Sequence, residues 1–156
     1  MRYAVAADHG GFPLKAPALR ELAALGHDGR DFGGTGAPDD DYPDITLSAA
    51  EAIRTGTIDR AVLICASGVG AAIAANRVPG VRAAVCHDSW SAHQGVEHDD
   101  MNVLCLGAEV VGGELALELI RAFASATFSG AERHVRRLAK VREIEQSYLQ
   151  TSKEPS

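Results

Sequence analysis

The sequence has no apolar run of about 18 residues, the length that crosses a membrane as a helix, and Asp8 and Lys15 interrupt its early apolar stretch. It therefore has neither a candidate membrane span nor the pattern of a secretory signal peptide. Cysteine is scarce as well, because there are only 3 cysteines and no two of them form a C-x-x-C pair. An odd number of cysteines without such spacing argues against a disulfide framework or a zinc knuckle. We expect a protein of the reducing cytoplasm.

Basic residues are also few, since acidic residues outnumber them. The chain has 15 Lys and Arg against 21 Asp and Glu, a formal net charge of −6, which argues against a general nucleic-acid binder. Its 156 residues, 46% hydrophobic and 23% charged, fit one globular domain. We predict a single domain over residues 1–150 and a frayed tail over 151–156.

Short apolar segments alternate along the chain with segments of helical periodicity. We predict strands at residues 2–7, 27–32, 61–65, 81–86 and 102–106. We predict helices from near Ala16 to residue 25, and at residues 45–55, 71–78, 89–96, 115–126 and 135–148. The first helix is expected to begin near Ala16 because Pro17 fits only a first turn. Residues 33–44 are expected to form a loop rich in turns.

The predicted strands are apolar throughout rather than alternating in polarity, which is typical of a parallel sheet covered on both faces. The fold class predicted is α/β, a Rossmann-like three-layer α/β/α sandwich with a five-stranded parallel sheet. Ligands bind such sheets at the carboxyl ends of the strands. Residues 8–11, residues 67–70 and the region after His87 are the loops expected there.

Cys65 is the first chemical candidate, because it ends the most apolar strand and is followed directly by the segment Ser67-Gly68-Val69-Gly70. Free backbone N–H groups in such a turn stabilise an anion. Cys65 could therefore be a base or nucleophile beside an oxyanion hole, and the alternative is a small buried thiol. Cys86 and Cys105 lie inside strands and are interpreted as core residues.

Two histidine-containing segments are weaker candidates. Asp8-His9 could orient a substrate oxygen or a phosphate, or Asp8 could simply be a helix N-cap. His98, within residues 97–100, suits proton transfer at a sugar oxygen, but the same segment could be a solvated loop. A zinc site built from His93, His98 and a cysteine is rejected, because no standard ligand spacing supports it.

Basic residues gather near the C-terminus at helical spacing. They are Arg133, Arg136, Arg137 and Lys140. Arg133 and Arg137, at i and i+4, could grip one phosphate, or the set could be a solvated helix face. Ile73 replaces the third glycine of a dinucleotide fingerprint and no P-loop motif occurs, so a nicotinamide or ATP enzyme is not expected.

Six short sequence motifs occur in one chain in a characteristic order. They are residues 8–12 (DHGGF), 41–43 (DYP), 64–70 (ICASGVG), 74–76 (AAN), His98 with 102–104 (NVL), and 130–137 (GAERHVRR). In this combination the chain resembles the ribose-5-phosphate isomerase type B family, which also includes galactose-6-phosphate isomerase subunits. The resemblance extends over residues 2–148.

The resemblance implies an aldose–ketose isomerase that needs no metal or cofactor and acts on a phosphorylated sugar through a cis-enediolate. It implies that Cys65 moves the proton between C1 and C2, and that Ser67 shuttles the proton between the two oxygens. It further implies that His98 opens the furanose ring with help from Asp8. Position 71, where another branch of the family has a catalytic glutamate, is Ala71 here.

The resemblance also implies the residues that hold the substrate. They are His9, Tyr42, Gly68, Val69, Gly70, Asp99, Arg133 and Arg137. In the family the site lies between two subunits, so a homodimer, and possibly a tetramer, is implied, with no nucleic-acid or membrane partner.

Two positions depart from the family pattern. Asp99 replaces the usual asparagine and Glu109 replaces the usual arginine. A carboxylate at position 109 would repel a phosphate unless it pairs with Arg133 or Arg137. These departures leave the sugar open, since a tetrose, pentose or hexose, phosphorylated or not, could be the substrate.

The leading hypothesis is therefore a sugar-phosphate isomerase acting on ribose 5-phosphate and ribulose 5-phosphate. A non-catalytic sugar-phosphate-binding module is the alternative from another class. A thiol-redox protein fits less well, because no resolving cysteine lies near Cys65 in the sequence.

Overall fold

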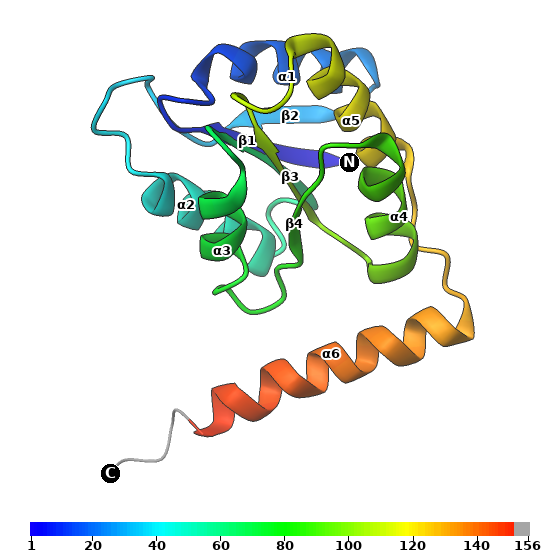
Figure 1. Ribbon diagram of the computed structural model, residues 1–156. Coiled ribbons are helices and arrows are strands. Elements are labelled where there is room, and N and C mark those ends of the chain that lie inside the picture. The colour runs from blue at the N-terminus through cyan, green and yellow to red at the C-terminus, as the bar shows by residue number, and fades with distance from the viewer. Residues whose placement is uncertain (152–156) are drawn as a thin grey trace.

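The computed structural model describes residues 1–151, which form five strands and six helices in regular alternation until the last helix (Figure 1). The strands are β1 (Arg2–Ala7), β2 (Asp28–Asp31), β3 (Arg60–Cys65), β4 (Ala83–Val85) and β5 (Val103–Gly107). The helices are α1 (Phe12–Ala24), α2 (Tyr42–Arg54), α3 (Val69–Ala75), α4 (Ser89–Asp99), α5 (Gly113–Ser125) and α6 (Glu132–Thr151). The tail predicted for 151–156 lies almost wholly outside the described residues.

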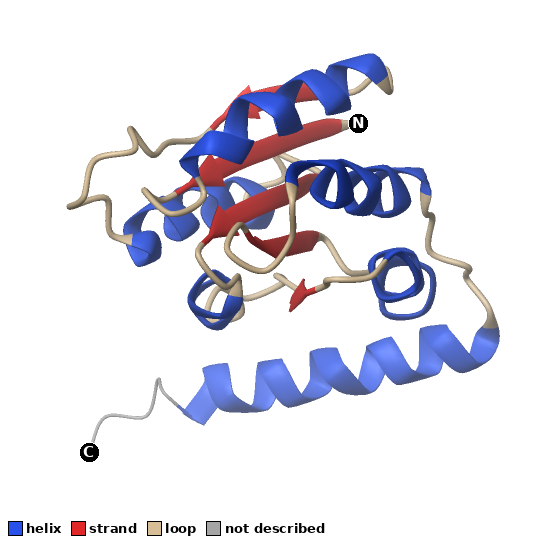
Figure 2. Ribbon diagram, turned by 45° about the horizontal axis from the view of Figure 1, so that its top comes forward, coloured by secondary structure: helices blue, strands red, loops and turns tan. Residues whose placement is uncertain are grey.

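The five strands make one sheet in the order β2-β1-β3-β5-β4, and every neighbouring pair is parallel. The predicted five-stranded parallel sheet is thus confirmed. Helices cover both faces: α1, α4 and α5 pack on one and α2 and α3 on the other (Figure 2). The fold is the predicted three-layer α/β/α sandwich.

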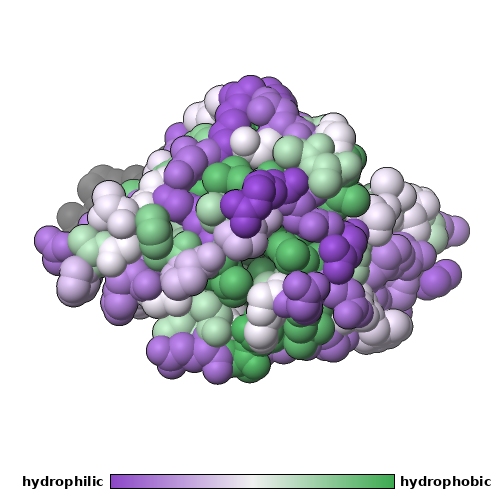
Figure 3. Space-filling view, turned by 90° about the horizontal axis from the view of Figure 1, so that it is seen from above, coloured by the Kyte–Doolittle hydropathy of each residue, from purple (hydrophilic) through white to green (hydrophobic). Residues whose placement is uncertain are grey.

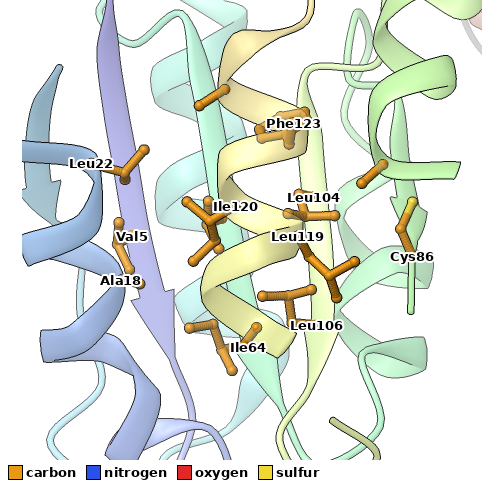
Figure 4. Packing of buried hydrophobic residues seen from close by; sticks show 14 of the residues in the cluster. Val5, Ala18, Leu22, Ile64, Cys86, Leu104, Leu106, Leu119, Ile120 and Phe123 are labelled. Atoms are coloured by element: carbon orange, nitrogen blue, oxygen red, sulfur yellow. The ribbon is translucent and has the colours of Figure 1, made fainter. Parts of the chain in front are cut away.

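Apolar strands buried on both faces build two cores. On the face of α1 and α5, Val5 lies beside Leu22 and Leu104 lies beside Leu119, all of them fully buried (Figure 4). The other face is lined by smaller residues such as Ala61, which lets α2 and α3 approach the sheet closely. The outer surface over α1 and α5 carries hydrophobic residues interspersed among hydrophilic ones (Figure 3). Among the described residues no helix is long and apolar enough to cross a membrane.

The prediction that the first helix begins near Ala16 is wrong. Helix α1 begins at Phe12, with Pro13 in its first turn and Pro17 inside the helix. Pro13 supplies a backbone angle suited to a helix start, while Pro17 only leaves the Pro13 carbonyl without its usual N–H donor. An early, favourable proline therefore outweighs the later one.

The predicted end of the fourth helix is also wrong. Helix α4 extends to Asp99, so His98 lies in its last turn rather than in a solvated loop. Asp100 ends the helix in the left-handed conformation, at φ 51°. Arg82 holds it there, because its Nη2 donates to Asp100 Oδ2 at 2.7 Å and its Nε to the Asp100 carbonyl at 2.7 Å.

Other boundaries differ by a few residues. The loop predicted over 33–44 ends earlier, because α2 begins at Tyr42 with Pro43 in its first turn. Helix α3 is earlier and shorter than predicted, and β4 keeps only its central three residues. Helix α6 lies outside the three layers and packs on α4, with His134 and Leu138 as its buried residues (Figure 2).

Candidate active site

The carboxyl ends of the three central strands are tied together by backbone hydrogen bonds. The Asp8 N–H donates to the Ile64 carbonyl at 3.2 Å, and the Ala108 N–H donates to the Cys65 carbonyl at 2.8 Å. The Glu109 N–H donates to the Ala66 carbonyl at 3.0 Å. The loops after β1, β3 and β5 therefore form one continuous edge, as the parallel sheet predicts.

Glycine at position 11 lets the first of these loops lie against β3. A Cβ atom added to Gly11 would stand 2.1 Å from the Ile64 carbonyl oxygen, so no larger residue fits. The Gly11 N–H donates to Asp8 Oδ1 at 3.0 Å, and the Asp8 side chain is held almost buried. The N-cap of α1 is Gly11, not Asp8, so the interpretation of Asp8 as a helix cap is wrong. His9 is exposed beside it.

Cys65 ends β3 with its sulfur turned toward the start of α3. The Gly68 N–H donates to Cys65 Sγ at 3.1 Å, and the Val69 N–H donates to Ser67 Oγ at 3.3 Å. Gly68 adopts φ +80°, a conformation that side chains disfavour, and it allows this reversal of the chain. The turn thus directs backbone N–H groups at the two side chains predicted to move protons.

All three thiols are buried, and they differ in their neighbours. Burial raises the pKa of Cys86 to about 11, and burial also raises the pKa of Cys105. Both thiols stay protonated at neutral pH, which agrees with their interpretation as core residues. Cys65 lies at the carboxyl end of the central strand β3, and its sulfur accepts a hydrogen bond from the backbone N–H of Gly68.

Tyr42 completes this side of the site. It begins α2, and a Cβ atom added to Gly70 would lie 2.9 Å from its ring, so glycine gives the ring room. Asp8, Tyr42 and Cys65 line one small cavity at the carboxyl edge, together with Thr46 and Ala71. We call Asp8, His9, Tyr42, Cys65 and Ser67–Gly70 the carboxyl-edge group.

The remaining predicted residues gather elsewhere, around the contact between α4 and α6. The His98 ring stacks on the ring of His134, with centroids 4.1 Å apart and planes at 32°. Arg133 and Arg137 are exposed on either side of His134 in the sequence, and Asp99 follows His98. We call His98, Asp99, Arg133 and Arg137 the α4–α6 group.

Within one chain the two groups are at opposite ends of the sheet. Cys65 pairs in register with Gly107, the last residue of β5, whereas α4 leads into the first residue of β5, Val103. Four strand steps of about 3.3 Å put roughly 13 Å of strand between them. A single chain therefore brings each group together but does not join the two.

Glu109 belongs to the carboxyl edge, where its side chain is exposed. No ion pair joins it to Arg133 or Arg137 in the part of the chain that the structure describes, so the pairing considered from the sequence does not occur within one chain.

Over residues 1–151, no cluster of three or more His, Cys, Asp and Glu side chains could hold a metal ion.

Sequence reasoning missed two residues beside His98. His134 is 2% exposed, and Gln94 Nε2 lies 2.8 Å from His98 Nδ1. The spacing of Gln94 and His98 at i and i+4 was the available signal. His134 gave none, because the meeting of α4 and α6 depends on tertiary packing.

Known proteins match this chain over most of its length. A family model described as Ribose/Galactose Isomerase matches residues 3–141. The ribose-5-phosphate isomerase B of Escherichia coli K12 is 39% identical over 145 residues, which cover 93% of this chain and 97% of that protein. The D-erythrulose-4-phosphate isomerase of Pectobacterium atrosepticum is 45% identical over 89 residues, 57% of this chain and 59% of that protein.

A solved structure agrees in fold as well as in sequence. The ribose-5-phosphate isomerase B of Clostridium thermocellum superposes with a TM-score of 0.90 at 44% identity, covering 95% of this chain and 99% of that one. With its parallel sheet and its cysteine at the carboxyl edge, the chain belongs to the ribose/galactose isomerase family and is an aldose–ketose isomerase of the ribose-5-phosphate isomerase B type.

Proposed function

We propose that this sugar-phosphate isomerase interconverts ribose 5-phosphate and ribulose 5-phosphate through a cis-enediolate, with Cys65 as the base. The observation that carries the proposal is the placement of Cys65 Sγ. It accepts a hydrogen bond from the Gly68 N–H and lines a cavity shared with Asp8 and Tyr42. A proton next to a carbonyl is weakly acidic, so its base must be held close and the developing oxyanion must meet fixed donors.

In this mechanism Cys65, as thiolate, takes the proton from C2 of the open aldose and the electron pair forms the enediolate. The same sulfur returns the proton to C1, while Ser67 carries a proton from O2 to O1. N–H groups of the turn from Ser67 to Gly70 would face the oxyanion. Tyr42, whose ring lies against Gly70, would line the same end of the substrate.

The phosphate would be bound by Arg133 and Arg137 of the α4–α6 group together with His9. Two guanidinium forks on one phosphate give a fixed handle at the far end of the sugar. Binding energy from that handle can hold the reacting carbons in place. His98 would open the furanose ring beside it.

These roles need two copies of the chain, because each copy keeps the carboxyl-edge group and the α4–α6 group about 13 Å of strand apart. We propose a homodimer in which each site joins the first group of one chain to the second group of its partner. Helix α6 offers a surface for it, since Val135, Val141 and Ile144 are exposed there. A cytoplasmic location and activity without a cofactor stay predictions.

A four-carbon sugar phosphate is the second candidate substrate. The relative from Pectobacterium atrosepticum is named a D-erythrulose-4-phosphate isomerase. Glu109 leaves the choice of sugar open here, because its exposed carboxylate at the carboxyl edge can accept hydrogen bonds from the hydroxyls of either sugar.

The test is to incubate the purified full-length chain, with a metal chelator present, with ribose 5-phosphate and in parallel with D-erythrulose 4-phosphate. We expect ribulose 5-phosphate to form from ribose 5-phosphate with a higher kcat/KM than that of the reaction of the four-carbon sugar. The reverse order of kcat/KM would assign the enzyme to the second candidate. Tight binding of both sugars without turnover would instead indicate a binding module.

A further inference from the structure

Gln94 contacts the histidine that the proposed function uses for ring opening. Both residues lie on α4, one turn apart, and both are half-buried. Gln94 Nε2 is 2.8 Å from His98 Nδ1. A side-chain amide nitrogen can only donate, so in this arrangement Nδ1 is the acceptor, and neutral His98 carries its proton on Nε2.

One face of the His98 ring is covered by the ring of His134. The ring of His134 is 4.1 Å away and the residue is 2% exposed. Its Nδ1 is 2.7 Å from Ser129 Oγ, and the Ser129 N–H donates to the Glu97 carbonyl at 2.9 Å. The turn before α6 is therefore fastened to the last turn of α4, and His134 cannot move aside without breaking these bonds.

His134 is kept uncharged by its position. Burial lowers its pKa, and the neighbouring His98, Arg133 and Arg137 lower it further. A neutral His134 ring gives the His98 ring a flat, uncharged surface to pack on. The His98 ring is thus held at Nδ1 by one neighbour and on its face by another.

We propose that Gln94 is a positioning residue that fixes the His98 ring with its proton on Nε2, so that Nε2 can donate to the furanose ring oxygen of the substrate. The inference rests on the proposed function. In the step, the C1–O4 bond breaks and its electron pair goes to O4, which the His98 Nε2–H stabilises with a hydrogen bond while a water molecule protonates it. The C1 hydroxyl gives its proton through Asp8 of the partner subunit to the hydroxide left by that water, and C1 becomes the carbonyl.

Gln94 is expected to affect only the opening of the furanose ring and not the isomerisation of the open sugar that follows. Ribulose 5-phosphate carries its phosphate on O5, so it cannot close a furanose ring and enters the site in open form. Exchange of its C1 proton with solvent needs the enediolate chemistry of Cys65 but no ring opening. The two reactions therefore separate the effect of Gln94 on His98 from any effect on the rest of the site.

The test is Gln94→Leu, which keeps the bulk of the side chain and removes the donor. Its matched control is Gln146→Leu, the same change at an exposed position on α6. We expect Gln94→Leu to lower kcat/KM for ribose 5-phosphate about tenfold, the order of one lost hydrogen bond. Exchange of the C1 proton of ribulose 5-phosphate in D₂O should stay within twofold of the wild-type rate, and the control should change neither reaction.

Equal losses in both reactions would overturn the inference, because Gln94 would then merely support the structure. Unchanged turnover of ribose 5-phosphate would overturn it as well. So would a wild-type enzyme that acts on D-erythrulose 4-phosphate alone, since that sugar has its O4 phosphorylated and forms no furanose. A wild-type chain that isomerises none of these sugars would refute the proposed function itself.

Discussion

Replacing Cys65 by alanine is expected to lower kcat by about 10²–10⁴-fold, the usual contribution of a positioned acid–base group. KM should change little, because in the proposed mechanism the thiol acts at the reacting carbons while other residues hold the phosphate. The fold should persist, because the sulfur atom that is removed lies at the carboxyl end of β3 and alanine is only slightly smaller than cysteine. Steady-state kinetics with ribose 5-phosphate and the urea midpoint of unfolding measure the two effects.

Cys86→Ala is the matched control. Cys86 is buried among the residues that pack on α5, on the opposite face of the sheet from Cys65, and burial raises its pKa to about 11. Its loss should cost some stability and leave kcat within about twofold. If Cys65→Ala keeps more than a tenth of the wild-type kcat, Cys65 is not the base.

Mixing two inactive variants is expected to restore activity if each site is built from two chains. One variant is Cys65→Ala, and the other is Arg133→Ala combined with Arg137→Ala. Random pairing makes about half of the dimers hybrid, and each hybrid has one intact site, so about a quarter of wild-type activity should return. The subunits are unfolded together and refolded before the assay.

The control mixture combines two variants altered in the same group, Cys65→Ala and Asp8→Asn. Hybrids of these chains have a defect in every site, so their activity should not exceed the mean of the two parents. Recovery in the control, or none in the test mixture, would contradict a site shared between two copies.

The order of strands and helices could be predicted from local patterns of apolar and polar residues in the sequence. Uninterrupted apolar runs such as residues 61–65 predicted buried parallel strands, because a strand covered on both faces has no polar side. The position of Cys65 at a strand end followed from the same pattern. Ser67 and Gly68 were then placed correctly in the turn that follows.

The ends of helices and the contacts between segments distant in the sequence could not be predicted in this way. The end of α4 depends on Asp100, a left-handed residue without glycine's freedom, which is held by Arg82 from another part of the chain. The contact of His98 with His134 depends on where α6 returns after α5. Neither is encoded by periodicity, because both arise from hydrogen bonds and packing between distant segments.

The separation of the two residue groups could be read only from the strand register. From the sequence alone His98 precedes a strand and Cys65 ends one. The structure gives those strand ends their distance, since Cys65 pairs with Gly107 while α4 leads into Val103. The resemblance to a family with sites between subunits had implied a partner, and the topology gives a physical reason for one.

The most direct test of the central chemistry is isomerisation of ribose 5-phosphate in D₂O, followed by proton NMR. In the proposed mechanism the proton taken from C2 can exchange with D₂O while it is on the Cys65 sulfur, so over many turnovers the ribulose 5-phosphate should acquire deuterium at C1. The Cys65→Ala variant should give neither product nor exchange. Product that stays free of deuterium after many turnovers at equilibrium would indicate a direct hydride shift from C2 to C1 and would contradict the mechanism.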